Sequence, residues 1–147
     1  GSNPRHVTDG GSVRGSIAGA GFPLGDYDPE WSLDGQLIVF ERGLSTQGNS
    51  GEGVWTICIT SLDGRHFRNL TNSQRVEGLP GFSPDGKRIV FFVFSQIDQL
   101  NDIMTIRPDG TGEQRLTDGF QTHDFYPSYI PGARSGEPAD APSHKPF

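Results

Sequence analysis

The clearest hydrophobic patterns in this sequence are short and of two kinds. Residues 37–40 and Ile89–Phe94 are continuous runs of aliphatic and aromatic residues, a pattern typical of strands buried on both faces. Residues 55–60 instead alternate, with apolar side chains at the odd positions and threonine or cysteine at the even ones, which predicts a strand with one apolar face. No segment shows a helical period, so the chain is predicted to be all-β.

Tight turns separate these runs. In Ser83-Pro84-Asp85-Gly86 the proline fixes φ, the aspartate caps its own backbone and the glycine adopts a positive φ. The pairs Asp63-Gly64 and Asp109-Gly110 predict hairpin turns. The segments that follow them, 67–71 and 113–117, are short and polar, as expected of strands at the outer edge of a sheet.

The turns and strands recur, which makes the chain a repeat protein. Residues 29–40 return as residues 80–91, at an offset of 51, and the later Asp-Gly and Leu-Thr pairs return at an offset of 46. The difference of five residues predicts a longer loop within 42–52. Residues 5–10 resemble the end of a unit, and residues 125–129 resemble the start of another.

Four strands in fewer than fifty residues, repeated, are the sequence form of a propeller blade. The order Pro-x-Trp-Ser-Pro-Asp-Gly, apolar strand, Asp-Gly and Arg-Leu-Thr resembles the WD40-like β-propeller repeat of the TolB type, and the resemblance extends over residues 29–119. Leu33 departs from it, since the second copy has Pro84. The resemblance implies four-stranded antiparallel blades whose apolar faces stack. The residues expected in that core are Trp31, Phe40, Ile57, Phe82, Phe91 and Ile106.

The repeat predicts how the chain is divided. The predicted parts are an N-terminal strand with a Gly-rich loop (1–25), a first blade (26–72), a second blade (73–119), a partial blade start (120–133) and a Pro-rich extended tail (134–147). The loops 42–52 and 95–101 are expected between the first and second strands of their blades, where specific contacts are natural.

Two blades form an incomplete ring, because propellers have at least four. The chain is therefore expected to be part of a longer propeller, to close a ring with other copies, or to stack head to tail into a filament. Residues 5–9 are the last strand either of a truncated blade or of a blade in a neighbour, to which they would be donated. The predicted interface residues are Arg5, His6, Val7, Thr8, Tyr129 and Ile130.

Composition narrows the classes of partner. The 147 residues carry a formal net charge of −6 with no run of lysine or arginine, which argues against nucleic acid and anionic membranes as partners. The longest apolar run is too short to insert into a bilayer. Cys58 is the only cysteine, so the chain has no internal disulfide and no cysteine-based zinc or haem motif. No cofactor is expected.

An acidic position repeats three residues before each opening proline. Asp26, Glu77 and Asp124 hold it, with Asp28 and His123 nearby. At the mouth of a propeller channel these groups could bind a hard cation or a cationic peptide group. Alternatively, each acid hydrogen-bonds to loop backbone and locks adjacent blades, which a repeated position favours. No metal-binding residues are assigned.

Signatures of catalysis are missing from the sequence. It has no Gly-x-Ser-x-Gly elbow and no glycine-rich phosphate loop followed by a helix. We therefore expect a non-enzymatic binding module that self-associates, in the periplasm or outside the cell. The alternatives are a TolB-like periplasmic scaffold and the gating propeller of an oligopeptidase-type serine hydrolase.

Overall fold

The computed structural model describes residues 3–9, 25–45, 53–94, 101–117 and 127–129. All regular structure in these ranges is β-strand, which confirms the all-β prediction. The strands are β1 (Asp26–Trp31), β2 (Leu37–Ser45), β3 (Val54–Ser61), β4 (Arg68–Asn69), β5 (Val76–Phe82), β6 (Ile89–Phe94), β7 (Asn101–Ile106) and β8 (Gln114–Arg115).

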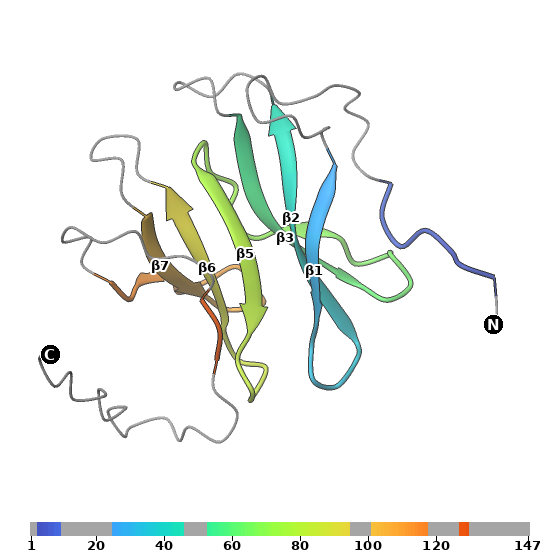
Figure 1. Cartoon of the computed structure of the whole chain (residues 1–147). Helices are drawn as coiled ribbons and strands as arrows, with labels where there is room; N and C mark the ends of the chain where they lie inside the picture. The colour runs from blue at the N-terminus through green and yellow to red at the C-terminus, as the bar shows by residue number, and fades with distance from the viewer. Residues whose placement is uncertain (1–2, 10–24, 46–52, 95–100, 118–126, 130–147) are drawn as a thin grey trace, which may run out of the picture.

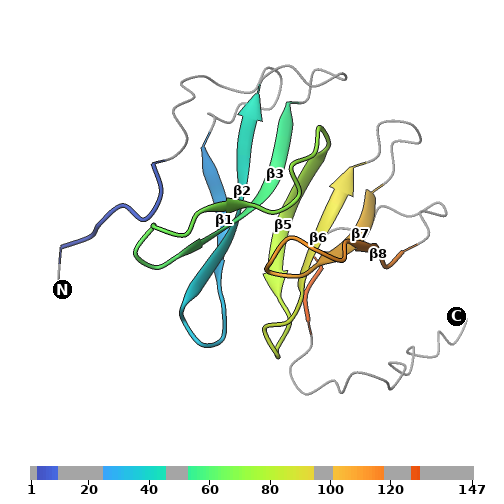
Figure 2. The same cartoon turned by 180° about the vertical axis from the view of Figure 1, so that it is seen from behind.

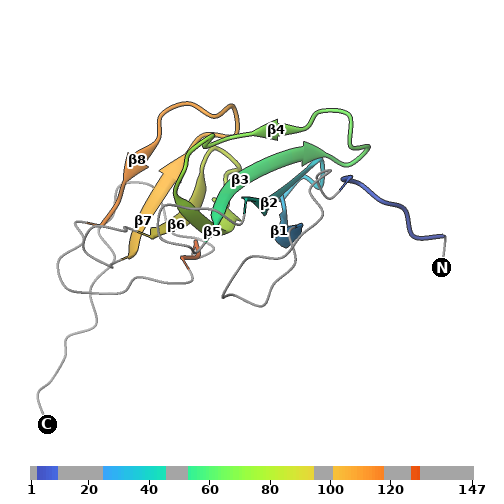
Figure 3. The ribbon, with the colours of Figure 1, turned by 90° about the horizontal axis from the view of Figure 1, so that it is seen from above.

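The strands form two antiparallel four-stranded sheets, in the orders β1-β2-β3-β4 and β5-β6-β7-β8. We call them blade 1 and blade 2. Figure 1 shows them packed face to face, and Figure 3 shows β4 and β8 at the outer edge of each blade. Seen from behind in Figure 2, residues 3–9 lie beside blade 1, on the side away from blade 2. The sequence repeat is thus a repeat of whole sheets.

The first strand of each blade was not predicted as a strand. β1 and β5 contain Pro29 and Pro80 and are each interrupted by a register shift, where Asp28 and Leu79 have positive φ values of 47° and 51°. A proline and a bulge conceal a strand from its sequence pattern. Consequently the prediction that the long loops follow the first strand is wrong, because they connect the second strand of each blade to the third.

Each blade has a turn between its first and second strands, and the same side-chain hydrogen bonds stabilise both turns. Ser83 Oγ donates to Asp85 Oδ1 (2.7 Å) and accepts from Arg88 N (2.9 Å), and Gly86 has a φ of 68°. Ser32 and Asp34 make the equivalent contacts in blade 1. The Ser-x-Asp-Gly motif therefore acts as an Asx-type turn that fixes strand pairing.

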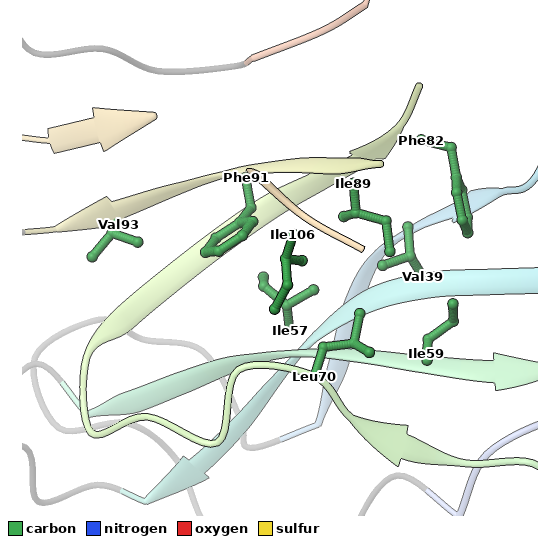
Figure 4. Packing of buried hydrophobic residues seen from close by; sticks show 9 residues of the cluster. All are labelled: Val39, Ile57, Ile59, Leu70, Phe82, Ile89, Phe91, Val93 and Ile106. Carbon is green, nitrogen blue, oxygen red and sulfur yellow. The ribbon is translucent and has the colours of Figure 1, made fainter. Parts of the chain in front are cut away.

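The main hydrophobic cluster lies between the blades, as Figure 4 shows. Val39, Ile57 and Leu70 of blade 1 pack against the face of blade 2 that carries Phe91 and Ile106. Successive residues of a strand point to opposite faces, so Phe40 and Arg42 lie on the opposite face of blade 1. We call this the open face of blade 1, because no blade of the described chain covers it.

Four of the six predicted core residues, Ile57, Phe82, Phe91 and Ile106, belong to the inter-blade cluster. Phe40 is buried too, but on the open face, below Arg42 and Phe67. The prediction for Trp31 is wrong, because its side chain is 54% exposed. Its repeat equivalent Phe82 faces blade 1, so Trp31 faces away from blade 2, towards the position of a preceding blade.

None of the described residues forms a helix that is long and apolar enough to cross a membrane.

Candidate functional site

Two glutamates of blade 1 bond directly to the backbone of blade 2. Glu41 Oε2 accepts from Leu79 N (2.9 Å) and Glu30 Oε1 accepts from Phe82 N (2.9 Å). Leu79 lies in the bulge of β5, where the register shift leaves backbone groups outside the regular ladder, and Phe82 lies just after it, opposite Ile89. The two carboxylates therefore fix the position of the innermost strand of blade 2 against blade 1.

Two glycines give these carboxylates room. A Cβ atom added to Gly78 would collide with Glu41 Oε2, and one added to Gly81 would lie 3.1 Å from Glu30 Oε2. The repeat-equivalent positions on blade 1 are Tyr27 and Glu30. The glycines thus adapt one blade to the carboxylates of its neighbour, a form of lock that the sequence analysis did not assign to these residues.

The pKa of Glu41 responds to its place in this lock. Burial raises the pKa of Glu41 from 4.5 to about 7, although the hydrogen bond from Leu79 lowers it, and Asp28 raises it further. In the unfolded chain the carboxyl loses its proton at a lower pH. The folded state therefore binds the proton more tightly than the unfolded state does.

We expect this contribution to the free energy of unfolding to be largest below pH 4.5 and to fall as the pH rises towards about 7. Glu41→Gln keeps an oxygen that accepts from Leu79 N but does not ionise. The melting temperature of the variant should therefore decline less than that of the wild type across this window, as measured by thermal unfolding at a series of pH values. Parallel declines for the two proteins would contradict the assignment.

The predicted acidic residues fall into separate ion pairs. Both carboxylate oxygens of Asp26 accept hydrogen bonds from Arg42, Oδ1 from Nε (2.6 Å) and Oδ2 from Nη2 (2.9 Å). Glu77 holds the equivalent place in blade 2, but Val93 stands opposite it in the ladder. Glu77 instead pairs with Arg75, whose Nη2 lies 2.8 Å from Oε1.

The remaining members of the predicted acidic cluster are exposed or undescribed. Asp28 is exposed at the bulge of β1, and His123 and Asp124 lie outside the described residues. Within the described ranges, no three histidine, cysteine or acidic side chains are grouped closely enough to hold a metal ion. Asp26 and Glu77, the described acidic groups of the repeated position, are thus engaged with arginines.

A serine, an aspartate and a histidine meet at the turn after β3. Ser61 Oγ donates to Asp63 Oδ1 (2.5 Å), and His66 Nδ1 lies 3.3 Å from the same hydroxyl. In a hydrolytic triad the histidine stands between the serine and the carboxylate. Here the serine stands between the other two and also accepts from His66 N (3.1 Å), so the arrangement is a turn cap.

The predicted N-terminal interface residues are placed as the outer strand of a preceding blade would be. Arg5 Nη2 donates to Leu62 O (2.9 Å), just as Arg68 of β4 donates to Asp109 O in the next blade (2.9 Å). The Val7 carbonyl fills the space above Gly64, and the Leu70 carbonyl lies over Gly110. Residues 5–8 contact blade 1 as residues 68–71 contact blade 2.

Residues 5–8 do not form the predicted strand, because no strand of the described chain pairs with them. His6 is exposed and Thr8 is partly buried. Their backbone lacks the neighbour that β3 provides for β4, where Cys58 and Ile59 stand opposite Asn69 and Arg68. This difference leaves the inner edge of residues 5–8 without a ladder.

Tyr129 marks the other end of the repeat. Its hydroxyl lies 3.5 Å from Thr105 Oγ1. Thr105 is the repeat equivalent of Ile59, which shares the inter-blade cluster with Phe82. Tyr129 therefore contacts blade 2 as Phe82 contacts blade 1. The other predicted interface residue at this end, Ile130, lies outside the described residues.

The comparisons with known proteins agree with this architecture. Over 89 residues the chain is 30% identical to the Tol-Pal system protein TolB of Francisella tularensis, in subspecies mediasiatica (strain FSC147) and in subspecies tularensis (strain FSC 198). The match covers 60% of this chain but only 19% of the length of those relatives. No family model matches the chain.

The fold is similar to solved propeller structures. A putative TolB from Agrobacterium tumefaciens superposes with a TM-score of 0.51 at 21% identity, over 65% of this chain and 36% of that one. The β-propeller domain of the Trilobed protease from Pyrococcus furiosus has a TM-score of 0.49 at 19% identity, over 63% and 27%. The two stacked sheets thus have the fold of two β-propeller blades, in a chain that is similar in sequence to a segment of TolB.

Proposed function

We propose that the chain is a non-enzymatic binding and assembly module whose open blade faces associate with a second copy. One observation carries the proposal: Trp31 is 54% exposed, whereas Phe82 at the equivalent position is 8% exposed because blade 1 covers it. A large aromatic side chain at a position built for burial is typical of an unfilled interface.

The matching surface is on blade 2. Val90, Ile103 and Thr105 occupy the repeat positions of Val39, Ile57 and Ile59, which pack against the neighbouring blade. Val90 and Thr105 are each 4% exposed in the single chain, and Tyr129 contacts Thr105. Once this cover moves away, docking of the surface on the open face of another copy would repeat the interface that joins blades 1 and 2. Such a contact is head to tail, so it gives a closed ring or a filament.

Completion by further blades of a longer polypeptide is the alternative. The placement of residues 5–8 and Tyr129 supports it, because both contact the blades as parts of flanking blades would. In that case the module is a segment of a TolB-like scaffold or of a gating propeller. A periplasmic or extracellular location, with proteins as partners, belongs to both versions of the proposal.

The solution mass tests self-association. Light scattering should give a mass above the 16.0 kDa of one chain, and Trp31→Glu should return the particle to the monomer because it places a charge in the interface. Lys87→Glu, on an exposed turn, is the control and should keep the wild-type mass. A wild-type monomer at the highest soluble concentration would reject self-association and favour completion by a longer chain.

A further inference from the structure

We propose that residues 5–8 of one copy replace β8 of a neighbouring copy and become the fourth strand of its blade 2. This inference rests on the proposed self-association and specifies how the copies are joined. It combines three observations, which concern the sequence of the two segments, the way residues 5–8 are held, and the way β8 is held.

The two segments match in sequence. His6-Val7-Thr8 aligns with Arg115-Leu116-Thr117 and with Asn69-Leu70-Thr71. In blade 2, Leu116 N donates to Ile103 O (2.8 Å), and Thr117 Oγ1 accepts from Ile103 N (2.9 Å). Thr71 Oγ1 makes the second of these contacts with Ile57 N in blade 1 (3.2 Å). Val7 N and Thr8 Oγ1 provide the same donor and acceptor in the same order.

Residues 5–8 are already prepared for this role. Arg5 and the Val7 carbonyl hold the segment on blade 1 in the manner of β4 on blade 2. A blade 2 from another copy that docks on the open face would bring its β7 beside this segment. Residues 5–8 are then already ordered by contacts within their own chain. This lowers the entropic cost of pairing them with β7 of the other copy.

The present occupant of the site, β8, is a short strand that is anchored by the ion pair of Arg115 with Asp102. β8 has two residues, Gln114 and Arg115, and both are exposed. Leu116 is 56% exposed, whereas its equivalent Leu70 is 6% exposed because blade 2 covers it. In the assembly Leu116 and Val7 would compete for one position over the open face of blade 1. Val7 is already attached there, so β8 is the strand that leaves.

The exchange conserves the backbone hydrogen bonds of the strand, but it gives up the ion pair of Arg115 with Asp102 and the bond from Arg88 to Gln114. The ladder pairs Met104 with Arg115 and Thr105 with Gln114, so the predicted intermolecular pairs are Met104 with His6 and Thr105 with Arg5. Val7 N would donate to Ile103 O, and Thr8 Oγ1 would accept from Ile103 N. The strand bonds lost with β8 are thus remade, while each donated segment now contacts blades of two copies.

The register can be tested by disulfide trapping in full-length chains. A copy with His6→Cys is mixed with a copy with Met104→Cys under mild oxidation, and Cys58, which is buried, stays in place. We expect a reducible dimer at least fivefold above the yield from His6→Cys mixed with Lys87→Cys, whose position is exposed and distant in the predicted register. Equal yields would overturn the register.

A second variant separates strand exchange from simple face-to-face docking. Val7→Pro removes the N–H that must donate to Ile103 O, while the carbonyl of residue 7 remains. Light scattering should then show loss of assembly with unchanged thermal stability of the monomer. An assembly that survives Val7→Pro and gives no specific disulfide would overturn strand exchange but leave the proposed function intact. A monomeric wild type would overturn both.

Discussion

Phe91→Ala is expected to reduce the free energy of unfolding by about 3 to 5 kcal/mol, because the side chain is fully buried between the blades. Blade 1 supplies one wall of its site through Ile57 and Leu70, and blade 2 supplies the other through Ile89 and Ile106. Neither wall can close the cavity without separating paired strands. Urea unfolding of the variant and the wild type measures this loss of free energy, provided that the free energy of unfolding depends on urea concentration with the same slope (m-value) in both proteins.

The repeat offers a matched comparison for this prediction. Phe40 is the equivalent of Phe91 and is also buried, but it is covered by Arg42 and by the half-exposed Phe67, whose ring lies 6.3 Å away. These side chains can move into the space that Phe40→Ala leaves, so this variant should lose less stability than Phe91→Ala. Leu33→Ala, at an exposed turn position, should change stability by less than about 0.5 kcal/mol.

Equal losses for Phe91→Ala and Phe40→Ala would contradict the picture of one inter-blade core and one uncovered face. That outcome would instead mean that the open face of blade 1 is packed as tightly in solution as the interface is. Repetition of the Phe40→Ala measurement with Trp31→Glu present would then show whether a second copy provides that cover, because the charge would remove it.

The sequence predicts most of the fold because its strongest signals are local. The apolar run Ile89–Phe94 coincides with β6, and the Ser-x-Asp-Gly turns are stabilised by side chains within five residues of one another. Local sequence patterns do not predict β1 and β5, because each strand contains a bulge in which one residue, Asp28 or Leu79, has a positive φ. The pairing that stabilises such a bulge is contributed by distant parts of the chain.

The contacts between blades were the least predictable part of the site. Glu41 directly follows the apolar run of β2, and Gly78 of blade 2 lies against it. The sequence shows a carboxylate after a buried strand and small residues in the next unit. Together these two features could have predicted a contact between the blades. Trp31 was misplaced for a different reason: the repeat correctly predicts the face that it occupies, but the cover of that face depends on a neighbouring blade.

Arg75→Met is expected to cost about 2 kcal/mol at neutral pH, because it leaves the carboxylate of Glu77 buried without its cation. The side chain of Glu77 is fully buried, with Oε1 bonded to Ser73 (2.7 Å) and to Arg75 Nε (2.9 Å). Its Oε2 lacks a hydrogen-bond partner in the described part of the chain. Arg75 is 38% exposed, so solvent screening places the cost below that of a fully buried pair.

The direction of the pH effect follows from Glu77. Burial raises the pKa of Glu77 above its ordinary value, against hydrogen bonds from Ser73 and Arg75 that lower it. Without Arg75 the carboxyl protonates more readily in the folded state, so the loss in Arg75→Met should shrink as the pH falls. The neutral pair Arg75→Met with Glu77→Gln should be more stable than Arg75→Met alone, by urea unfolding at neutral pH.

Arg75 also bonds to Glu113 (2.7 Å), and this contact needs its own control. Glu113→Gln removes the outer carboxylate but leaves Arg75 beside Glu77. Because Glu113 is partly exposed to solvent, we expect a loss below about 1 kcal/mol. If Glu113→Gln costs as much as Arg75→Met, the arginine stabilises the protein by joining the end of blade 2 to the loop before β5. If it costs little, the buried charge of Glu77 is what Arg75 is required to neutralise.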